Sequence, residues 1–396
     1  MSTVTTVRPA PKAGADTARL YSVQALRAVA ALLVVWAHSI DAAEQSHSLP
    51  VQIGFFHWEN FGASGLDIFF VISGFIVSLV AARAATKNAE ERGSGRNWRS
   101  AKTFLIRRVT RIFPLYWILT LVLILESELS RYKIAWHSVP WLPTLLLLPT
   151  GRVPVQPPLL SIGWSLIFEF YFYYVLAVFL FWTPRALMRN TVVFLSAMAG
   201  IGFIIGIQHS FLALWMNPMI LEFVFGCWVG WLYLRRGKRA NEKSHLGQWI
   251  ALFGAGLLAA TIFTGYGNAS EEDIILSGYA CWLRVGVWGI PAALLVGGMV
   301  FWNPALRSLP ARLLVFLGDA SYSIYLCTAL VRSVVVHFWH SVFGRFGADM
   351  GVLLSAAFCT CVGIFCYLCI ERPLMRITHN WQKPVPFGRN PATAAG

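Results

Sequence analysis

The chain has 396 residues, of which 57% are hydrophobic and only 13% are charged, and its mean hydropathy is +0.61. Soluble globular domains carry about 25% charged residues, so this composition excludes that class, and the apolar runs are too long to be strands of a membrane β-barrel. A net charge of +14 would suit a nucleic-acid partner, but the basic residues are grouped by loop. That grouping favours a helical membrane protein with no nucleic-acid partner.

Ten apolar segments are predicted to cross a bilayer, whose hydrocarbon layer takes about 20 apolar residues of helix. The predicted spans are 22–41, 61–82, 112–126, 160–183, 191–208, 212–234, 248–266, 276–301, 313–340 and 351–370. The apolar stretch 141–149 is too short to cross and is expected to be re-entrant or interfacial. We therefore predict an all-α, polytopic membrane protein with a disordered cytoplasmic tail at 1–19, a transmembrane domain at 20–375 and a second cytoplasmic tail at 376–396.

The distribution of Lys and Arg predicts the orientation. When the connections are assigned alternately to two sides, 25 of the 32 basic residues fall on one side and 4 on the other, while Arg27, Arg284 and Arg332 lie within spans. Basic residues concentrate in cytoplasmic loops, so both termini are expected in the cytoplasm. All seven Cys fall in apolar segments, where we expect free thiols and no metal site.

The first predicted span carries Arg27 and His38. A titratable side chain within a membrane helix is costly and by default suggests a functional site. Eleven positions at about 100° each return to within about 20° of the start, so the two residues share one helix face, roughly 16 Å apart. The pair offers a cation near one end of the span and a proton acceptor near the other. In the alternative, Arg27 snorkels to the headgroups and His38 lies in the far interface, with no chemistry.

The second span opens with FGASGLDIFFVISGF, residues 61–75. Gly62 and Gly65 allow a tight turn at the membrane edge. Asp67 is expected near the outer boundary, close in depth to His38, where its carboxylate could orient the histidine or bind a sugar hydroxyl. The alternative is a structural carboxylate favoured by the dipole at a helix N-terminus.

The third span is preceded by FLIRRVTRIFPLYW, residues 104–117, in which Arg107, Arg108 and Arg111 cluster at the cytoplasmic entry. Arg107 and Arg111 are four residues apart and so share a helix face. Arginine binds phosphate through a planar fork of donors, which makes this cluster a candidate seat for a phosphorylated cytosolic donor. The alternative is the anchoring of a helix to anionic lipid.

Further acidic and basic residues lie within the predicted spans. Glu169, in SIGWSLIFEFYFYYV (161–175), is expected to be protonated or paired, and Arg27 is a partner by depth if the two helices are neighbours. Structural pairing is the expected explanation for Glu222, Arg284 and Arg332. The last motifs are GDASYSIYL and the closing Glu-Arg-Pro at 371–373, where proline is expected to stop the helix.

Taken in order, these motifs resemble the acyltransferase 3 family of integral-membrane acyltransferases over about residues 20–375, and look most like its bacterial exopolysaccharide-acetylating subgroup. The resemblance implies a multi-pass protein of the bacterial inner membrane. It implies transfer of an acyl group, with acetyl expected, from cytoplasmic acyl-CoA to a hydroxyl of a cell-surface, exported or lipid-linked glycan. Acetyl-CoA is then a substrate and no bound cofactor is expected. Membrane lipid and polysaccharide-assembly proteins are the other candidate partners.

The resemblance also implies residue roles. The candidate catalytic residues are His38, Arg27, Glu169 and Asp67, and the candidate acyl-CoA-binding residues are Arg107, Arg108, Arg111, Tyr116 and Ser165. Many relatives carry a histidine where this chain has Thr328, so a second histidine role there is unsupported. Two other functions stay open at this point. A transporter or flippase for a lipid-linked glycan would also place charges in the membrane, and a structural partner in polysaccharide assembly would need no catalytic histidine.

Overall fold

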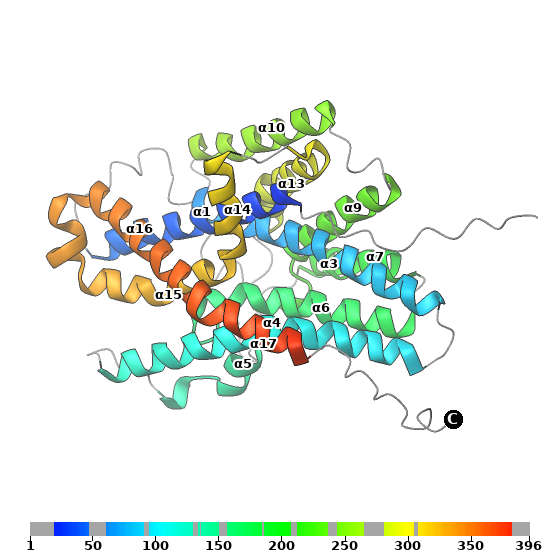
Figure 1. The fold of residues 1–396 in the computed structure, drawn as a ribbon, viewed down its shortest axis with the longest axis horizontal. Coiled ribbons are helices and arrows are strands. Elements are labelled where there is room, and N and C mark those ends of the chain that lie inside the picture. The colour runs from blue at the N-terminus through cyan, green and yellow to red at the C-terminus, as the bar shows by residue number, and fades with distance from the viewer. Residues whose placement is uncertain are drawn as a thin grey trace, which may run out of the picture.

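The computed structural model describes residues 20–46, 61–90, 95–129, 134, 136–149, 157–183, 186–206, 212–236, 244–264, 281–304 and 308–381. Within these ranges every regular element is a helix, which confirms the predicted all-α class (Figure 1).

The helices fall into long apolar segments and short connecting turns. The long ones are α1 (Tyr21–Gln45), α3 (Ser64–Glu90), α4 (Gly95–Leu129), α6 (Trp164–Trp182), α7 (Leu187–Ile205), α9 (Ile220–Arg236), α10 (His245–Ala260), α13 (Ile290–Trp302), α15 (Ser321–His337) and α16 (Ala348–Cys366). The shorter ones are η2 (Trp136–Ser138), α5 (Trp141–Leu146), η3 (Ser161–Gly163), α8 (Leu212–Trp215), η6 (Thr261–Phe263), α12 (Cys281–Arg284), η8 (Val285–Gly289), α14 (Leu309–Asp319), η9 (Trp339–Phe343), η10 (Gly344–Phe346), η11 (Tyr367–Glu371) and α17 (Arg372–Trp381).

The described residues contain nine helical segments long and apolar enough to cross a membrane, or ten if a bent pair counts as one span. The bent pair is α14 and α15, which meet at 67° where a single ninth span was predicted. The bend lies where α14 passes very close to α1, because a Cβ on Gly318 would come within 1.9 Å of the Gln24 carbonyl oxygen. Only glycine permits that approach.

The connection between the second and third spans is more helical than predicted. Helix α3 continues to Glu90 and α4 begins at Gly95, so α4 has 35 residues instead of the 15 predicted as span. The basic extension escaped a hydropathy-based prediction because it is polar. The short α5 does not span, as predicted. The Thr144 carbonyl oxygen of α5 accepts a hydrogen bond of 2.7 Å from Tyr116 Oη, and another α5 carbonyl oxygen accepts one of 2.8 Å from Trp117 Nε1. These two bonds fix α5 against α4.

The prediction that proline stops the last span is wrong. The chain passes from α16 through one π-helical turn, η11, directly into α17, which contains Pro373 in its first turn. Proline is tolerated in the first turn of a helix, where its missing N–H is not needed for the ladder.

Helix α1 lies at the centre of the bundle and packs against α3, α14, α15 and α16 (Figure 1). Its contact positions are small, and Ala28, Ala30 and Ala31 are fully buried. Small residues let membrane helices approach closely. A Cβ on Gly65 would lie 2.3 Å from the Ala30 carbonyl oxygen, which places the start of α3 at the depth of the middle of α1.

Candidate active site

Five helices, α1, α3, α4, α6 and α15, surround a cavity of about 100 Å³. Its lining residues are Arg27, Leu66, Phe69, Phe70, Ile72, Ser73, Ile76, Val77, Arg108, Arg111, Ile112, Ser165, Leu166, Glu169, Tyr173, Ser321, Tyr322 and Tyr325. On α3 the lining runs from Leu66 to Val77, eleven helical steps that rise about 16 Å. The cavity is therefore elongated along the helices, with apolar walls and a few charged groups.

Three cations face this cavity. Arg27 comes from α1, and Arg108 and Arg111, three residues apart, come from one face of α4. The guanidinium of Arg108 lies 5.5 Å from the ring centroid of Phe104 and 5.5 Å from that of Tyr173, a cation–π arrangement. Its Nε is buried and has no hydrogen-bond partner within the described part of the chain.

Arg107 is separated from these three cations. It is exposed and does not line the cavity, since it is turned about 100° from Arg108 around α4. The sequence predicted that Arg107 and Arg111 share the functional face of the helix, whereas the cavity is lined by Arg108 and Arg111.

Glu169 is satisfied by hydroxyl groups. Its Oε1 accepts a hydrogen bond of 2.9 Å from Ser73 Oγ and another from Tyr173 Oη. Arg27 and Glu169 line the same cavity, but no ion pair within 4 Å joins these two described residues. The sequence therefore identified the buried acid but missed Ser73, whose position on α3 opposite α6 is visible only in the fold.

A second acid, Glu371 in η11, belongs to the same charge cluster and was missed as a site residue. It is 3% exposed, accepts a hydrogen bond of 2.5 Å from Ser323 Oγ, and interacts electrostatically with Arg27 and Arg111. Arg27 also interacts electrostatically with Glu169 and Asp319, so the three guanidinium groups lie near three carboxyl groups. Arg108 and Arg111 border the cavity and present donors that suit an anionic ligand.

Two hydroxyl groups in the cavity lining, those of Ser165 and Tyr325, lie against each other. Ser165 Oγ and Tyr325 Oη are 2.6 Å apart, and each is also within hydrogen-bond distance of the carbonyl oxygen of Ile162, at 3.2 and 2.9 Å. The ring of Phe69 contacts that of Tyr325 edge-on, with 5.9 Å between centroids. Tyr116, in contrast, does not line the cavity, because its hydroxyl points to α5.

His38 lies in a separate, smaller recess of about 10 Å³, lined by His38, Ser39, Ala42, Thr328, Val331, Arg332, Val335, Ser355 and Cys359. Arg27 and His38 therefore share a side of α1 but not a cavity. The two recesses are adjacent, because Tyr325 lines the first and Thr328, one helical turn further along α15, lines the second.

The carboxylate beside His38 is Asp41. The distance from His38 Nδ1 to Asp41 Oδ2 is 3.0 Å, and the two side chains are 31% and 41% exposed. A carboxylate on Nδ1 fixes the proton there and leaves Nε2 as the acceptor nitrogen. The spacing of three residues in a helix was readable in the sequence and was overlooked.

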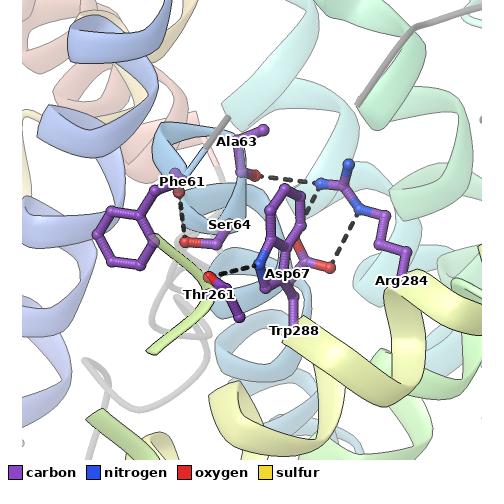
Figure 2. Close-up of polar contacts among 7 residues, drawn as sticks. All are labelled: Phe61, Ala63, Ser64, Asp67, Thr261, Arg284 and Trp288. Atoms are coloured by element: carbon purple, nitrogen blue, oxygen red, sulfur yellow. Dashed lines mark hydrogen bonds and ion pairs between the residues drawn. The ribbon is translucent and has the colours of Figure 1, made fainter. Parts of the chain in front are cut away.

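Asp67 occupies a different part of the bundle, and the prediction that it lies at the depth of His38 is wrong. It is fully buried and accepts from Arg284 Nε at 3.2 Å and Nη2 at 2.8 Å, while Nη2 also donates to the Ala63 carbonyl oxygen at 3.1 Å (Figure 2). Figure 2 also shows Trp288, whose Nε1 donates to Thr261 Oγ1 at 3.1 Å and whose ring lies 4.8 Å from the Arg284 guanidinium. The pair joins α3 to α12.

The other two intramembrane charges differ from Arg284, whose structural pairing is confirmed. Both carboxyl oxygens of Glu222 are buried without a hydrogen-bond partner among the described residues, but Glu222 interacts electrostatically with Asp67 and Arg284 and so lies beside that pair. Arg332 forms no ion pair with any described residue, so the expected structural pairing is confirmed only for Arg284.

Sequence comparisons identify the family of this chain. A family model described as an acyltransferase domain, that of acyltransferase 3, matches residues 20–371. The chain is 29% identical over 327 residues to the exopolysaccharide production protein ExoZ of Rhizobium meliloti, covering 81% of this chain and 92% of that protein. It is 26% identical over 422 aligned positions to the acyltransferase MdmB of Streptomyces mycarofaciens, covering 95% and 96%.

No solved structure matches the chain. The family match extends over most of the sequence and includes every residue of the cavity and of the His38 recess. The chain therefore belongs to the acyltransferase 3 family and is a multi-pass membrane O-acyltransferase.

Proposed function

We propose that this enzyme transfers an acetyl group from cytoplasmic acetyl-CoA to a hydroxyl of a cell-surface or exported glycan, from the bacterial inner membrane. The observation that carries the proposal is the convergence of Arg27, Arg108 and Arg111 on one elongated cavity that ends one helical turn from a histidine recess. The similarity to ExoZ, an exopolysaccharide production protein, supports a glycan acceptor.

The donor fits the charge and shape of the cavity. CoA combines several phosphates with a long, thin arm that ends in the thioester. Arg108 and Arg111 would hold phosphate oxygens by charge-assisted hydrogen bonds, with the exposed Arg107 near the entrance and Arg27 deeper in the bundle. The apolar wall along α3 would surround the arm over about 16 Å, the helical rise from Leu66 to Val77.

His38 is the proposed base or nucleophile. In direct transfer, Nε2 takes the proton of the acceptor hydroxyl, whose oxygen bonds to the acetyl carbon. The carbon–sulfur bond breaks and the CoA thiolate takes up a proton. In the two-step route, Nε2 attacks the acetyl carbon, the carbon–sulfur bond breaks and CoA leaves as the thiolate. The acceptor oxygen then bonds to the acetyl carbon, the carbon–nitrogen bond breaks, and the hydroxyl proton passes through the freed Nε2 to solvent or to the CoA thiolate. Either route requires the thioester to pass Tyr325, so the contact of Tyr325 with Ser165 must open during turnover.

The test is thiol release from acetyl-CoA by the purified protein, with and without a glycan acceptor. We expect release that depends on the acceptor and falls by about 100-fold or more in His38→Ala, the scale of general acid–base catalysis. Thermal unfolding of the variant should match that of the wild type. Labelled acetyl retained on His38 without acceptor would identify the two-step route. Unchanged thiol release and glycan acetylation in His38→Ala would contradict the proposal.

A further inference from the structure

Arg332 of α15 lines the same recess as His38 and has no role in the mechanism described so far. It lies within the bent membrane segment, five residues before the end of α15. A guanidinium at such a position is costly unless a partner offsets its charge. No described carboxylate forms an ion pair with it.

The other polar groups of the recess are already committed. The hydroxyls of Ser39, Thr328 and Ser355 each donate to a backbone carbonyl of their own helix, at 2.8, 2.9 and 2.9 Å. The recess has one acid at its edge, Asp41, and that carboxylate is bound to His38 Nδ1. Among the described lining residues, Arg332 therefore supplies the strong donors that remain for a ligand.

We propose that Arg332 binds an anionic group of the acceptor, so that the enzyme acylates a hydroxyl lying close to a negative charge. The proposal rests on the acyl-transfer function proposed above. The planar fork of a guanidinium matches the two oxygens of a carboxylate or phosphate. The anion is thus a sugar carboxylate of the glycan or a phosphate of its lipid carrier. Holding it at Arg332 presents a neighbouring hydroxyl to His38 Nε2.

The competing explanation is that Arg332 snorkels to the phosphates of bulk lipid. Five residues of helix separate it from the end of α15, a rise of about 8 Å, which a long side chain can bridge. Its position in the lining of the His38 recess, between α1 and α16, favours a ligand in that recess. The two explanations differ in one measurable property, the dependence of transfer on acceptor charge.

The experiment uses the full-length protein in nanodiscs of zwitterionic phosphatidylcholine, with acetyl-CoA and two matched pairs of acceptors. One pair is a glucuronic-acid-containing oligosaccharide and its carboxyl-reduced form. The other is a polyprenyl phosphate glycoside and the neutral polyprenyl glycoside of the same sugar. We expect wild-type kcat/KM to favour the anionic member of at least one pair by about tenfold or more, the scale of one charge-assisted hydrogen bond. The pair that shows the preference identifies the source of the anion.

Arg332→Gln should abolish this preference. Transfer to the neutral member should stay within about threefold of the wild-type rate, because a neutral acceptor loses less than the energy of one hydrogen bond when Arg332 is replaced. Arg345→Gln, which removes an exposed cation outside the recess, is the matched control and should keep the preference. Arg332→Lys keeps the charge without the fork and should keep a reduced preference. Arg332→Lys replaces Arg332→Gln as the test variant if Arg332→Gln does not fold. Equal use of both members by the wild type, or a preference that survives in Arg332→Gln, would overturn the inference.

A binding measurement separates this inference from the proposed function. Affinity of the inactive His38→Ala protein for each acceptor is measured without turnover. Tighter binding of the anionic member that depends on Arg332 supports the inference even if no thiol is released from acetyl-CoA. Acetyl transfer without any Arg332-dependent preference supports the proposed function and rejects the inference.

Discussion

Two groups of charges lie inside the same bundle and are treated differently by the fold. Asp67 and Arg284 are fully or almost fully buried, bind each other through two hydrogen bonds, and line neither of the two recesses described above (Figure 2). Arg27, Arg108 and Arg111 face a cavity, and the Nε of Arg108 has no partner in the described part of the chain. Intramembrane charge is thus not a sufficient sign of a catalytic site. A charge with unused hydrogen-bonding capacity that borders a cavity is the stronger sign.

The largest expected effect comes from breaking the closed pair. Asp67→Ala leaves the Arg284 guanidinium buried without its carboxylate, which should lower the free energy of unfolding by about 3–5 kcal/mol. Thermal unfolding followed by size-exclusion chromatography measures the loss. The double variant Asp67→Ala with Arg284→Met removes both charges and should recover much of the stability. A single variant as stable as the wild type would show that the pair does not hold the helices together.

The cavity cations should behave in the opposite way. Arg111→Gln is expected to raise KM for acetyl-CoA by about 10- to 100-fold, the loss of a charge-assisted hydrogen bond to phosphate, with little change in thermal unfolding. Arg107→Gln is the matched control, since it removes a neighbouring cation that does not line the cavity. We expect its effect on KM to stay below about threefold. Equal effects of the two substitutions would mean that only the general charge of this end of the bundle matters.

A smaller effect is expected at Asp41. Asp41→Asn keeps the shape of the side chain but no longer stabilises the proton on His38 Nδ1. We expect kcat to fall by about tenfold while KM for acetyl-CoA stays constant. This fall in kcat is smaller than that expected for a buried catalytic triad, because the contact is partly exposed. Transfer assays on equal amounts of folded protein measure this fall. A loss of folded protein that accounts for the whole fall would assign Asp41 a structural role.

The smallest effect tests how Glu169 is held. Ser73→Ala removes one of its two hydroxyl partners and leaves Tyr173 in place. A neutral hydrogen bond contributes about 1 kcal/mol, so acetyl transfer should fall by about threefold to fivefold with unchanged thermal unfolding. Ser78→Ala, on the same helix but bonded to the Phe75 carbonyl, is the control and should have no effect on transfer. A fall of more than 100-fold in Ser73→Ala would indicate a direct catalytic role for Ser73.

Much of the fold could be predicted because the signals are local. Long apolar runs identify the spans, and the short run at α5 identifies a segment that does not cross. The bend between α14 and α15 could not be predicted from local hydropathy, and it lies at a tertiary contact, the close approach of Gly318 to Gln24. The helical extension of α4 was missed because it is polar.

The candidate site was predictable in part, because charged residues within apolar segments are also a local signal. Of the nine candidate residues, the cavity brings together Arg27, Arg108, Arg111, Ser165 and Glu169, while His38 lies in the neighbouring recess. Arg107, Tyr116 and Asp67 lie outside both. A sequence motif does not say toward which neighbour a side chain points.

The sequence by itself determined the number and type of membrane segments, the presence of charges inside them and the family, because hydropathy, composition and motif order are properties of the linear chain. Only the tertiary structure decided which of those charges pair, which face a cavity, and that Asp41 contacts His38 while Asp67 binds Arg284. The physical reason is that each contact between helices depends on which helices are neighbours and how each is rotated. These quantities are set by close packing at small residues such as Gly65 and Ala30.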